Sequence, residues 1–391
     1  MSVKNKWEAS FLKEMSLKTD PLADDLIKNI IKNKGFGELR MLFKTLNDND
    51  DKAGSASTNT AVVNYFNAEL TLPIWADQDK IALAEQMFLK NGPEISLLLN
   101  FKALPLCYTS KGGAKILALS GRMTEQGDNT EKLTRRLMET AQMVINVMSP
   151  GGFDPKGKGI ITIKKVRLYH AAIRSFILNQ QANKEGWDVE QFGAPINQEE
   201  LAGTQMAFSA LTIKGLEQLG CDLTVEEKDA YIHCWNIVGH FLGIDPQLYP
   251  ENYEEGFSLG LAILKRNCGS SADGKLLTKS LIDFSANFIP GKLFDGIPVH
   301  FIDLFIEDIG KDIDMNLNEV LGIPDKRNWW LKLLISIFDF LDKLTGLTKI
   351  TDKLFPRLNL RILQGMINHY LKTTKTEFYI PESLKQNWNL K

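Results

Sequence analysis

Apolar residues recur at every third or fourth position along most of the chain, between residues that start or stop helices. This spacing predicts helices, because one face of a helix repeats about every 3.6 residues. The predicted helices run from Trp75 to Gly92, from Asn129 to Pro150, from Asn197 to Gly220 and from Thr224 to Gly243. The best strand candidate, Ile160–Ile163, is very short and has no partner in sequence. The sequence therefore predicts an all-α fold.

Two of these predicted helices begin with the residue types of a capping box. Asn197 stands three residues before Glu200, and Thr224 stands three residues before Glu227. In this motif the first side chain accepts a hydrogen bond from the backbone of the fourth residue, whose own side chain reaches back. Glycine at position 243 predicts where the second of these helices ends.

Length and composition indicate a globular protein. The chain has 391 residues, of which 44% are hydrophobic and 24% are charged, enough to bury a substantial core. A polar stretch from Leu46 to Thr60, rich in small residues, predicts a linker. We therefore expect an N-terminal helical extension and linker over residues 1–60, a main helical domain over 61–320, and C-terminal helices over 321–391 that pack on it or cap it.

Several classes of protein are disfavoured by composition. A formal net charge of -2 argues against a general nucleic-acid binder. The four cysteines form no CxxC pair, which suits reduced thiols and excludes the CxxCH signature of covalently attached haem. The first 20 residues have no signal-peptide core, and no apolar run reaches the roughly 18 residues of a membrane span. We expect a cytoplasmic protein whose apolar C-terminal helices, around Trp329, allow contact with a membrane surface.

One strongly cationic segment runs from Pro155 to Lys184, with seven Lys or Arg and no Asp or Glu. Within it, the sequence VRLYHAAIRS predicts a helix that carries His170 on its apolar stripe, with Arg167 and Arg174 at the edges. Along the helix axis the two arginines lie about 4.5 Å and about 6 Å from the histidine. Such a helix needs an anion, and the neighbouring sequence supplies none.

Three interpretations fit this helix. His170 can be a core histidine bonded to a carbonyl, with two solvated arginines beside it. It can ligate the iron of haem b, whose two propionates would take the arginines. It can also belong to a cationic face for another anion, such as an acyl phosphate, a nucleic acid or a membrane surface. The preceding helix bears on this choice, because Arg136 and Thr140 share a face and form a second arginine-hydroxyl pair.

Together these motifs resemble the haem-binding signature of the latex-clearing-protein (rubber oxygenase) family, which includes the MpaB-type oxygenases of fungal secondary metabolism. The pair Arg136-x-x-x-Thr140 is followed by Arg167-x-x-His170-x-x-x-Arg174, with the histidine 30 residues after the threonine. The resemblance extends over about residues 70 to 260. It includes the stretches SGRM from Ser120, MSPGG from Met148, FGAPINQEELAGTQMAFS from Phe192 and CWNIVGHFLGI from Cys234.

This resemblance implies a globin-like helical domain with non-covalent haem b and His170 as its proximal metal ligand. It implies that Arg167, Arg174, Arg136 and Thr140 line the cofactor, near its propionates or its distal face. For the better-known members it also implies oxygen-dependent cleavage of an isoprenoid double bond.

Two positions depart from the family pattern. Glu139 stands where rubber oxygenases have a lysine that can cap the iron, and Ser120 stands where they have an acidic residue used in oxygen chemistry. A carboxylate over haem, its pKa raised by burial, can act as a proton shuttle in oxygen or peroxide activation. Glu139 can equally turn outward and pair with a surface cation. Cleavage of rubber therefore does not follow from the resemblance.

We therefore expect a haem b-dependent oxygenase that uses O2 or peroxide on a small hydrophobic, isoprenoid or lipid-like substrate. The candidate catalytic residues are Glu139, Thr140 and Arg136, and the candidate metal ligand is His170. The alternative is a non-catalytic haem-binding sensor or carrier whose sixth coordination position is occupied. No nucleic-acid partner is expected.

Overall fold

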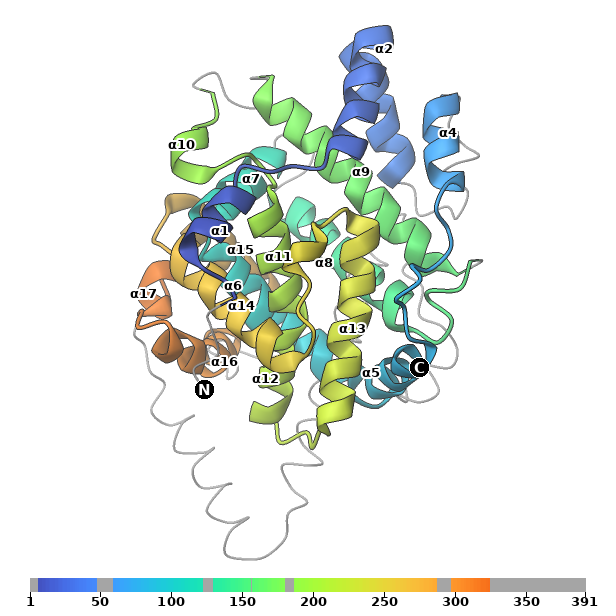
Figure 1. Cartoon of the computed structure of the whole chain (residues 1–391). Helices are drawn as coiled ribbons and strands as arrows, with labels where there is room; N and C mark the ends of the chain where they lie inside the picture. The colour runs from blue at the N-terminus through green and yellow to red at the C-terminus, as the bar shows by residue number, and fades with distance from the viewer. Residues whose placement is uncertain are drawn as a thin grey trace, which may run out of the picture.

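The computed structural model describes residues 6–47, 59–121, 129–155, 157–179, 186–286 and 297–323. All regular secondary structure in these ranges is helical (Figure 1), which confirms the all-α prediction. The first half of the chain contains α1 (Ala9–Met15), α2 (Pro21–Asn47), α4 (Thr60–Asn67), α5 (Gln78–Leu98), the π-helix η1 (Leu99–Ala103), α6 (Leu104–Tyr108), α7 (Lys111–Gly121), α8 (Asn129–Met148) and α9 (Lys158–Leu178). The second half contains α10 (Val189–Phe192), α11 (Gln198–Phe208), α12 (Ala210–Gln218), α13 (Val225–Leu242), the 3-10 helix η2 (Pro246–Leu248), α14 (Tyr253–Asn267), α15 (Ala272–Ala286), α16 (Ile297–Asp312) and α17 (Leu317–Leu321).

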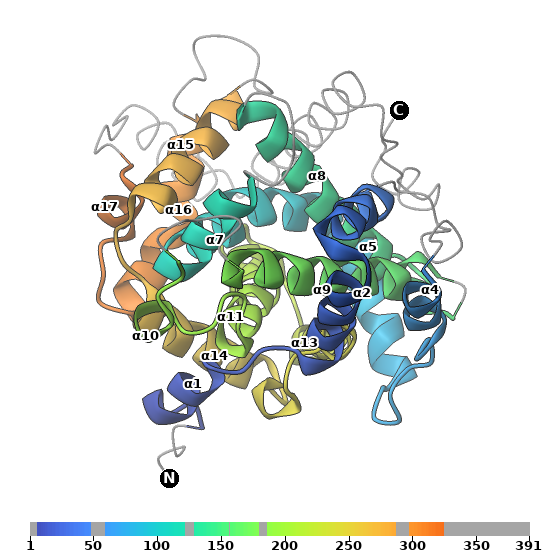
Figure 2. The ribbon, with the colours of Figure 1, turned by 90° about the horizontal axis from the view of Figure 1, so that it is seen from above.

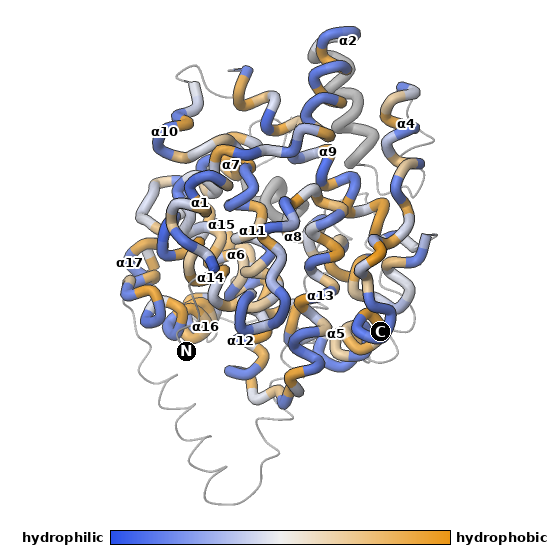
Figure 3. Tube along the Cα trace, in the orientation of Figure 1, coloured by the Kyte–Doolittle hydropathy of each residue, from blue (hydrophilic) through white to orange (hydrophobic). Residues whose placement is uncertain are grey.

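Helix α9 occupies the middle of the packing. It contacts α8, α13 and α2, while α13 also packs along α5. Figure 2, which views the molecule from above, shows α9 crossing the structure with α2 lying over it. Hydrophobic and hydrophilic residues alternate along helices such as α5 and α13 (Figure 3), as expected where one face of each helix is buried. The cationic helix α9, which carries His170, is therefore packed on several sides.

The helix starts predicted from capping residues are present. The Thr224 side chain accepts from the backbone N–H of Glu227, whose side chain accepts from the N–H of Thr224, so this capping box is complete. Helix α13 ends at Gly243, whose φ of 79° is in the left-handed region that favours glycine. At α11, the Asn197 side chain accepts from the backbone of Glu200, but the Glu200 side chain lies elsewhere.

Helix α5 is longer than predicted. The sequence predicts a stop at Gly92, but the helix continues through Gly92 and Pro93 to Leu98 and then into η1. Both residues are buried, so packing against the core outweighs the cost of a proline inside a helix, which is typically about 3 kcal/mol. This extension carries the chain straight into α6.

Two further predictions of local structure are wrong. Ile160–Ile163 lies within the first two turns of α9 and is not a strand. Its β-branched residues favour strands only weakly, and Ile160 and Ile163 lie in the core of a helical packing. The helix predicted from Asn197 to Gly220 is two helices, α11 and α12, because Ser209 leaves the helical region with φ -113° and ψ -89°.

The ends of the chain bear on the predicted domains. Helices α1 and α2 belong to the predicted N-terminal extension, and α2 packs along α9. Most of the predicted linker and nearly all of residues 321–391, including Trp329, lie outside the described residues. The domain boundaries and the globin-like arrangement stay predictions. In the part of the chain that the structure describes, no helix is long and apolar enough to cross a membrane.

Candidate functional site

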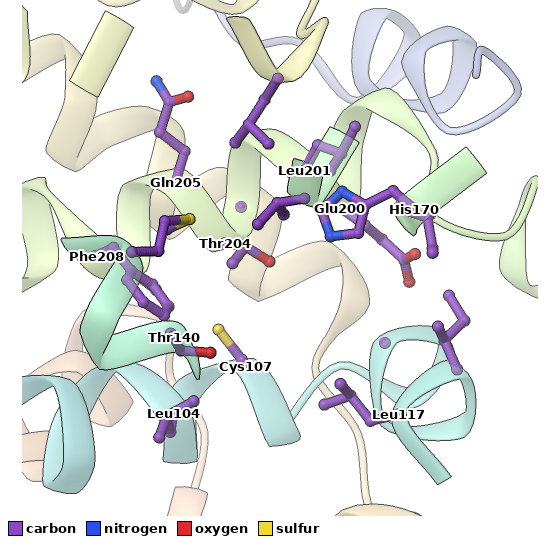
Figure 4. Close-up of a pocket in the computed structure, with 18 of the residues that line it drawn as sticks. Leu104, Cys107, Leu117, Thr140, His170, Glu200, Leu201, Thr204, Gln205 and Phe208 are labelled. Atoms are coloured by element: carbon purple, nitrogen blue, oxygen red, sulfur yellow. The ribbon is translucent and has the colours of Figure 1, made fainter. Parts of the chain in front are cut away.

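A cavity of about 940 Å³ lies among α6, α7, α8, α9, α11, α13 and α14. This volume is at the upper end of the range of about 300–1,000 Å³ typical of small-molecule and cofactor sites. Its walls are mostly apolar, with a small number of polar side chains between them. Figure 4 shows part of this wall, where His170, Glu200 and Thr204 stand among Leu104, Leu117, Leu201 and Phe208. Large apolar walls with few polar groups are the usual form of a site for a hydrophobic ligand.

One face of α9 forms a wall of the cavity. The residues on this face follow helical spacing and are Lys158, Ile161, Thr162, Lys165, Val166, Tyr169, His170 and Ile173. His170 is thus on a cavity wall, as its place on the apolar stripe predicts. The same face carries two cations, Lys158 and Lys165, which the sequence analysis did not single out as site residues.

Helix α8 contributes the residues predicted for the distal side. Glu139 and Thr140 both line the cavity that His170 lines, so the structure brings these three candidates together. The backbone of Arg136 is part of α8, but its side chain lies outside the described residues. The buried Ser120 hydroxyl donates to the carbonyl oxygen of Leu117 at 3.0 Å and is not on the cavity wall.

Both predicted propionate partners, Arg167 and Arg174, have other partners. Arg167 donates to both carboxylate oxygens of Asp20, from Nε at 2.6 Å and from Nη2 at 2.7 Å. Arg174 donates from Nε to Asp24 at 2.8 Å and from Nη1 to the carbonyl oxygen of Ile196 at 2.7 Å. Asp20 immediately precedes α2 and Asp24 lies in its first turn, so the start of this helix supplies the anions that the sequence around α9 lacks.

Helix geometry explains why the arginines do not face the cavity. At about 100° per residue, Arg167 and Arg174 lie about 60° and about 40° from His170, both on the same side of it. Those offsets are enough to move the guanidinium groups from the cavity face to the face that packs on α2. Arg167 and Arg174 are both absent from the residues that form the cavity wall.

Glu200 also lines the cavity, although the sequence predicts for it only a place in a helix start. Burial and the neighbouring Glu199 raise its pKa to about 8, and hydrogen bonds from the Ile196 backbone and the Ser110 side chain offset this only in part. The preceding residue, Glu199, has a cationic partner, because it forms an ion pair with Arg266 at 2.6 Å. Glu200 has no cation among the described residues within ion-pair distance, so its carboxyl group is largely protonated at neutral pH.

We predict that Glu200 makes the protein less stable as the pH rises from about 5 to about 8. In this range the unfolded chain loses the proton, because the ordinary glutamate pKa is 4.5, while the folded chain keeps it. The folded state then binds more protons, so the free energy of unfolding falls by at most about 1.4 kcal/mol per pH unit. Thermal unfolding of the Glu200→Gln variant should show a higher Tm than the parent at pH 8 and a similar Tm at pH 5. An equal pH slope in the two proteins would contradict the assignment.

Comparison with known proteins agrees with the resemblance seen in the motifs. Residues 99–267 match the family described as "ER-bound oxygenase mpaB/B'/Rubber oxygenase, catalytic domain". The chain is also 23% identical over 232 residues to a rubber oxygenase of Streptomyces sp. (strain K30). That alignment covers 56% of this chain and 52% of the relative, so the chain spans about half the length of the curated relative it matches.

A solved structure has the same fold. The structure of latex clearing protein LCP in the closed state is similar over 94% of this chain and 95% of that chain, with a TM-score of 0.71 and 16% sequence identity. The predicted resemblance to the rubber-oxygenase and MpaB-type family is therefore confirmed over residues 99–267. The similar solved structure confirms the all-α fold. The matched region contains Glu139, Thr140, His170 and Glu200.

Proposed function

We propose, because residues 99–267 relate the chain to the MpaB-type and rubber-oxygenase family, that this protein is a haem b-dependent oxygenase of a small hydrophobic molecule. The observation that carries the proposal is the shared cavity of His170, Glu139 and Thr140. These residues come from two different helices, and they match the proximal and distal positions of the motif.

The residues of the cavity fit haem b. A flat, largely apolar macrocycle needs apolar walls, and α6, α8, α9 and α11 supply leucine, isoleucine, methionine and phenylalanine side chains. His170, on the cavity wall, would hold the iron through its imidazole. The volume of about 940 Å³ also leaves space for a second hydrophobic molecule beside the cofactor. When bound, haem would supply the redox chemistry that activates O2 or peroxide.

We assign the carboxylates of the cofactor to lysines rather than to the predicted arginines. Lys158 and Lys165 are on the cavity face of α9, on the N-terminal side of His170. Lys165 lies five residues from His170, which is about 7.5 Å along the helix axis. Arg167 and Arg174 instead hold α9 against α2 through Asp20 and Asp24, and so fix which face of α9 the cavity receives.

On the other side of the cavity, Glu139 and Thr140 are the candidate catalytic residues, together with Arg136 from the motif. A carboxylate and a hydroxyl on one wall can hold or move a proton beside a bound oxidant. The apolar walls exclude water and orient the substrate. These features support an unsaturated, isoprenoid or lipid-like substrate. They do not require the substrate to be a polymer.

The experiment that tests this proposal uses the full chain purified from haem-supplemented cells. We expect a strong Soret band and oxygen uptake that depends on an added unsaturated isoprenoid. Added cyanide or CO should shift the band quickly, because an oxygenase keeps the sixth position accessible. A protein that binds haem but exchanges no ligand and consumes no oxygen would be the sensor or carrier of the alternative hypothesis. A colourless protein after reconstitution with haem would overturn both.

A further inference from the structure

One carboxyl oxygen of Glu200, the buried Oε2, has no hydrogen-bond partner among the described residues. The side chain is part of the cavity wall, and Figure 4 shows it beside the space that His170 and Thr204 also face. Buried polar atoms in proteins nearly always have a partner, so a buried acceptor on a cavity wall indicates a group that arrives with the ligand.

The position of this carboxyl group is closely determined. The Asn197 side chain accepts from the Glu200 backbone at 2.9 Å and fixes the first turn of α11. On the other side, a Cβ added at Gly112 of α7 would lie 2.6 Å from Glu200 Oε1. The absence of a side chain at Gly112 therefore lets the carboxyl group lie directly against α7. This is a built arrangement of two helices around one acidic group.

The chemistry of the surroundings selects the kind of partner. The nearest other carboxylate in sequence, Glu199, forms an ion pair with Arg266, and Leu201 and Ile196 beside Glu200 are apolar wall residues. The pKa of about 8 means that the group is mostly uncharged at neutral pH, and a neutral carboxyl both donates and accepts hydrogen bonds. An alcohol hydroxyl also does both and matches it, whereas a hydrocarbon would leave Oε2 unpaired.

We propose that Glu200 recognises a hydroxyl group carried by an otherwise hydrophobic ligand, so that the substrate of this protein is an alcohol and not a pure hydrocarbon. This inference rests on the proposed function for the hydrophobic class of the substrate. It adds the polar group by which one end of that substrate is oriented in the cavity.

Isothermal titration calorimetry on the full chain tests this inference with two probes, geraniol and geranyl methyl ether. They have the same isoprenoid skeleton, and only geraniol has an O–H donor. We expect the parent protein to bind geraniol about tenfold more tightly than the ether, as one good hydrogen bond allows. In Glu200→Leu this preference should fall to about twofold or less, because leucine keeps the wall apolar and removes both oxygens.

Two further variants guard against a trivial effect on folding. Gly112→Ala keeps the glutamate but displaces its carboxyl group, so it should also reduce the preference. Glu190→Gln, at an exposed residue of α10, should leave it unchanged. Equal binding of the two probes by the parent, binding of neither, or an unchanged preference in Glu200→Leu would overturn the proposal. The haem content of the same samples, read from absorbance, tests the proposed function separately: a colourless protein that prefers geraniol would refute only the haem assignment.

Discussion

The His170→Ala variant is expected to lose the Soret band of the haem-loaded protein and to keep its fold. His170 is on a cavity wall, and alanine there removes the imidazole without opening a hole in the packed core. If His170 holds the iron, haem in this variant would be held only by contacts with the cavity walls, so we expect haem affinity to fall by more than about tenfold. Absorbance after haem titration measures this loss, and circular dichroism checks the fold.

Imidazole added to this variant provides a sharper test. A free imidazole fits the space left by the side chain and should restore part of the band. The matched control is His233→Ala on α13, because the Nε2 of His233 accepts from the backbone N–H of Asp77 and His233 is not on the cavity wall. Its spectrum should equal that of the parent. Full haem binding by His170→Ala, with the parental spectrum, would show that another residue holds the iron.

The Arg174→Leu variant should be destabilised by about 3–5 kcal/mol, the usual cost of breaking a buried ion pair from one side. Arg174 is only 1% exposed, and it joins Asp24 of α2 to the carbonyl of Ile196 just before α11. Leucine would leave the Asp24 carboxylate buried without its cation. Chemical denaturation with urea measures the change in the free energy of unfolding.

Two companion variants show whether this loss comes from the unpaired charge. The double variant Arg174→Leu/Asp24→Leu should recover a large part of the stability, because neither side then leaves a buried charge. Lys279→Ala removes one side of a pair with Asp283 in which both side chains are mainly exposed, and it should change stability by about 1 kcal/mol or less. A loss in Arg174→Leu no larger than in Lys279→Ala would mean that the α2–α9 pairs do not stabilise the protein.

The parts of the fold that follow from local chemistry could be predicted from the sequence. The capping box of Thr224 and Glu227 and the left-handed Gly243 define α13 by interactions within a few residues. The errors occur where distant packing decides the structure. Pro93 remains inside α5 because it is buried in the core, and Ile160–Ile163 is helical because its neighbours are helices.

The site divides in the same way. His170, Glu139 and Thr140 could be predicted to share a cavity, because their helical spacing and the family motif carry that information. The partners of Arg167 and Arg174 could not, since Asp20 and Asp24 are 147 and 150 residues away and no motif marks them. Glu200 could not be predicted as a site residue, because a glutamate at this position is also typical of a helix start. Its side chain lines the cavity instead.

The distance along the chain between α2 and the arginines of α9 also determines when α2 can dock on α9 during synthesis. At about 5–20 residues per second, a ribosome needs roughly 7 to 30 s to make the 147 residues between Asp20 and Arg167. During this interval α2 has neither of the cations that hold it, so its docking is a late step. Contacts so far apart in sequence also slow folding. The face of α9 that carries His170 therefore acquires its final orientation only after more than 170 residues have been joined.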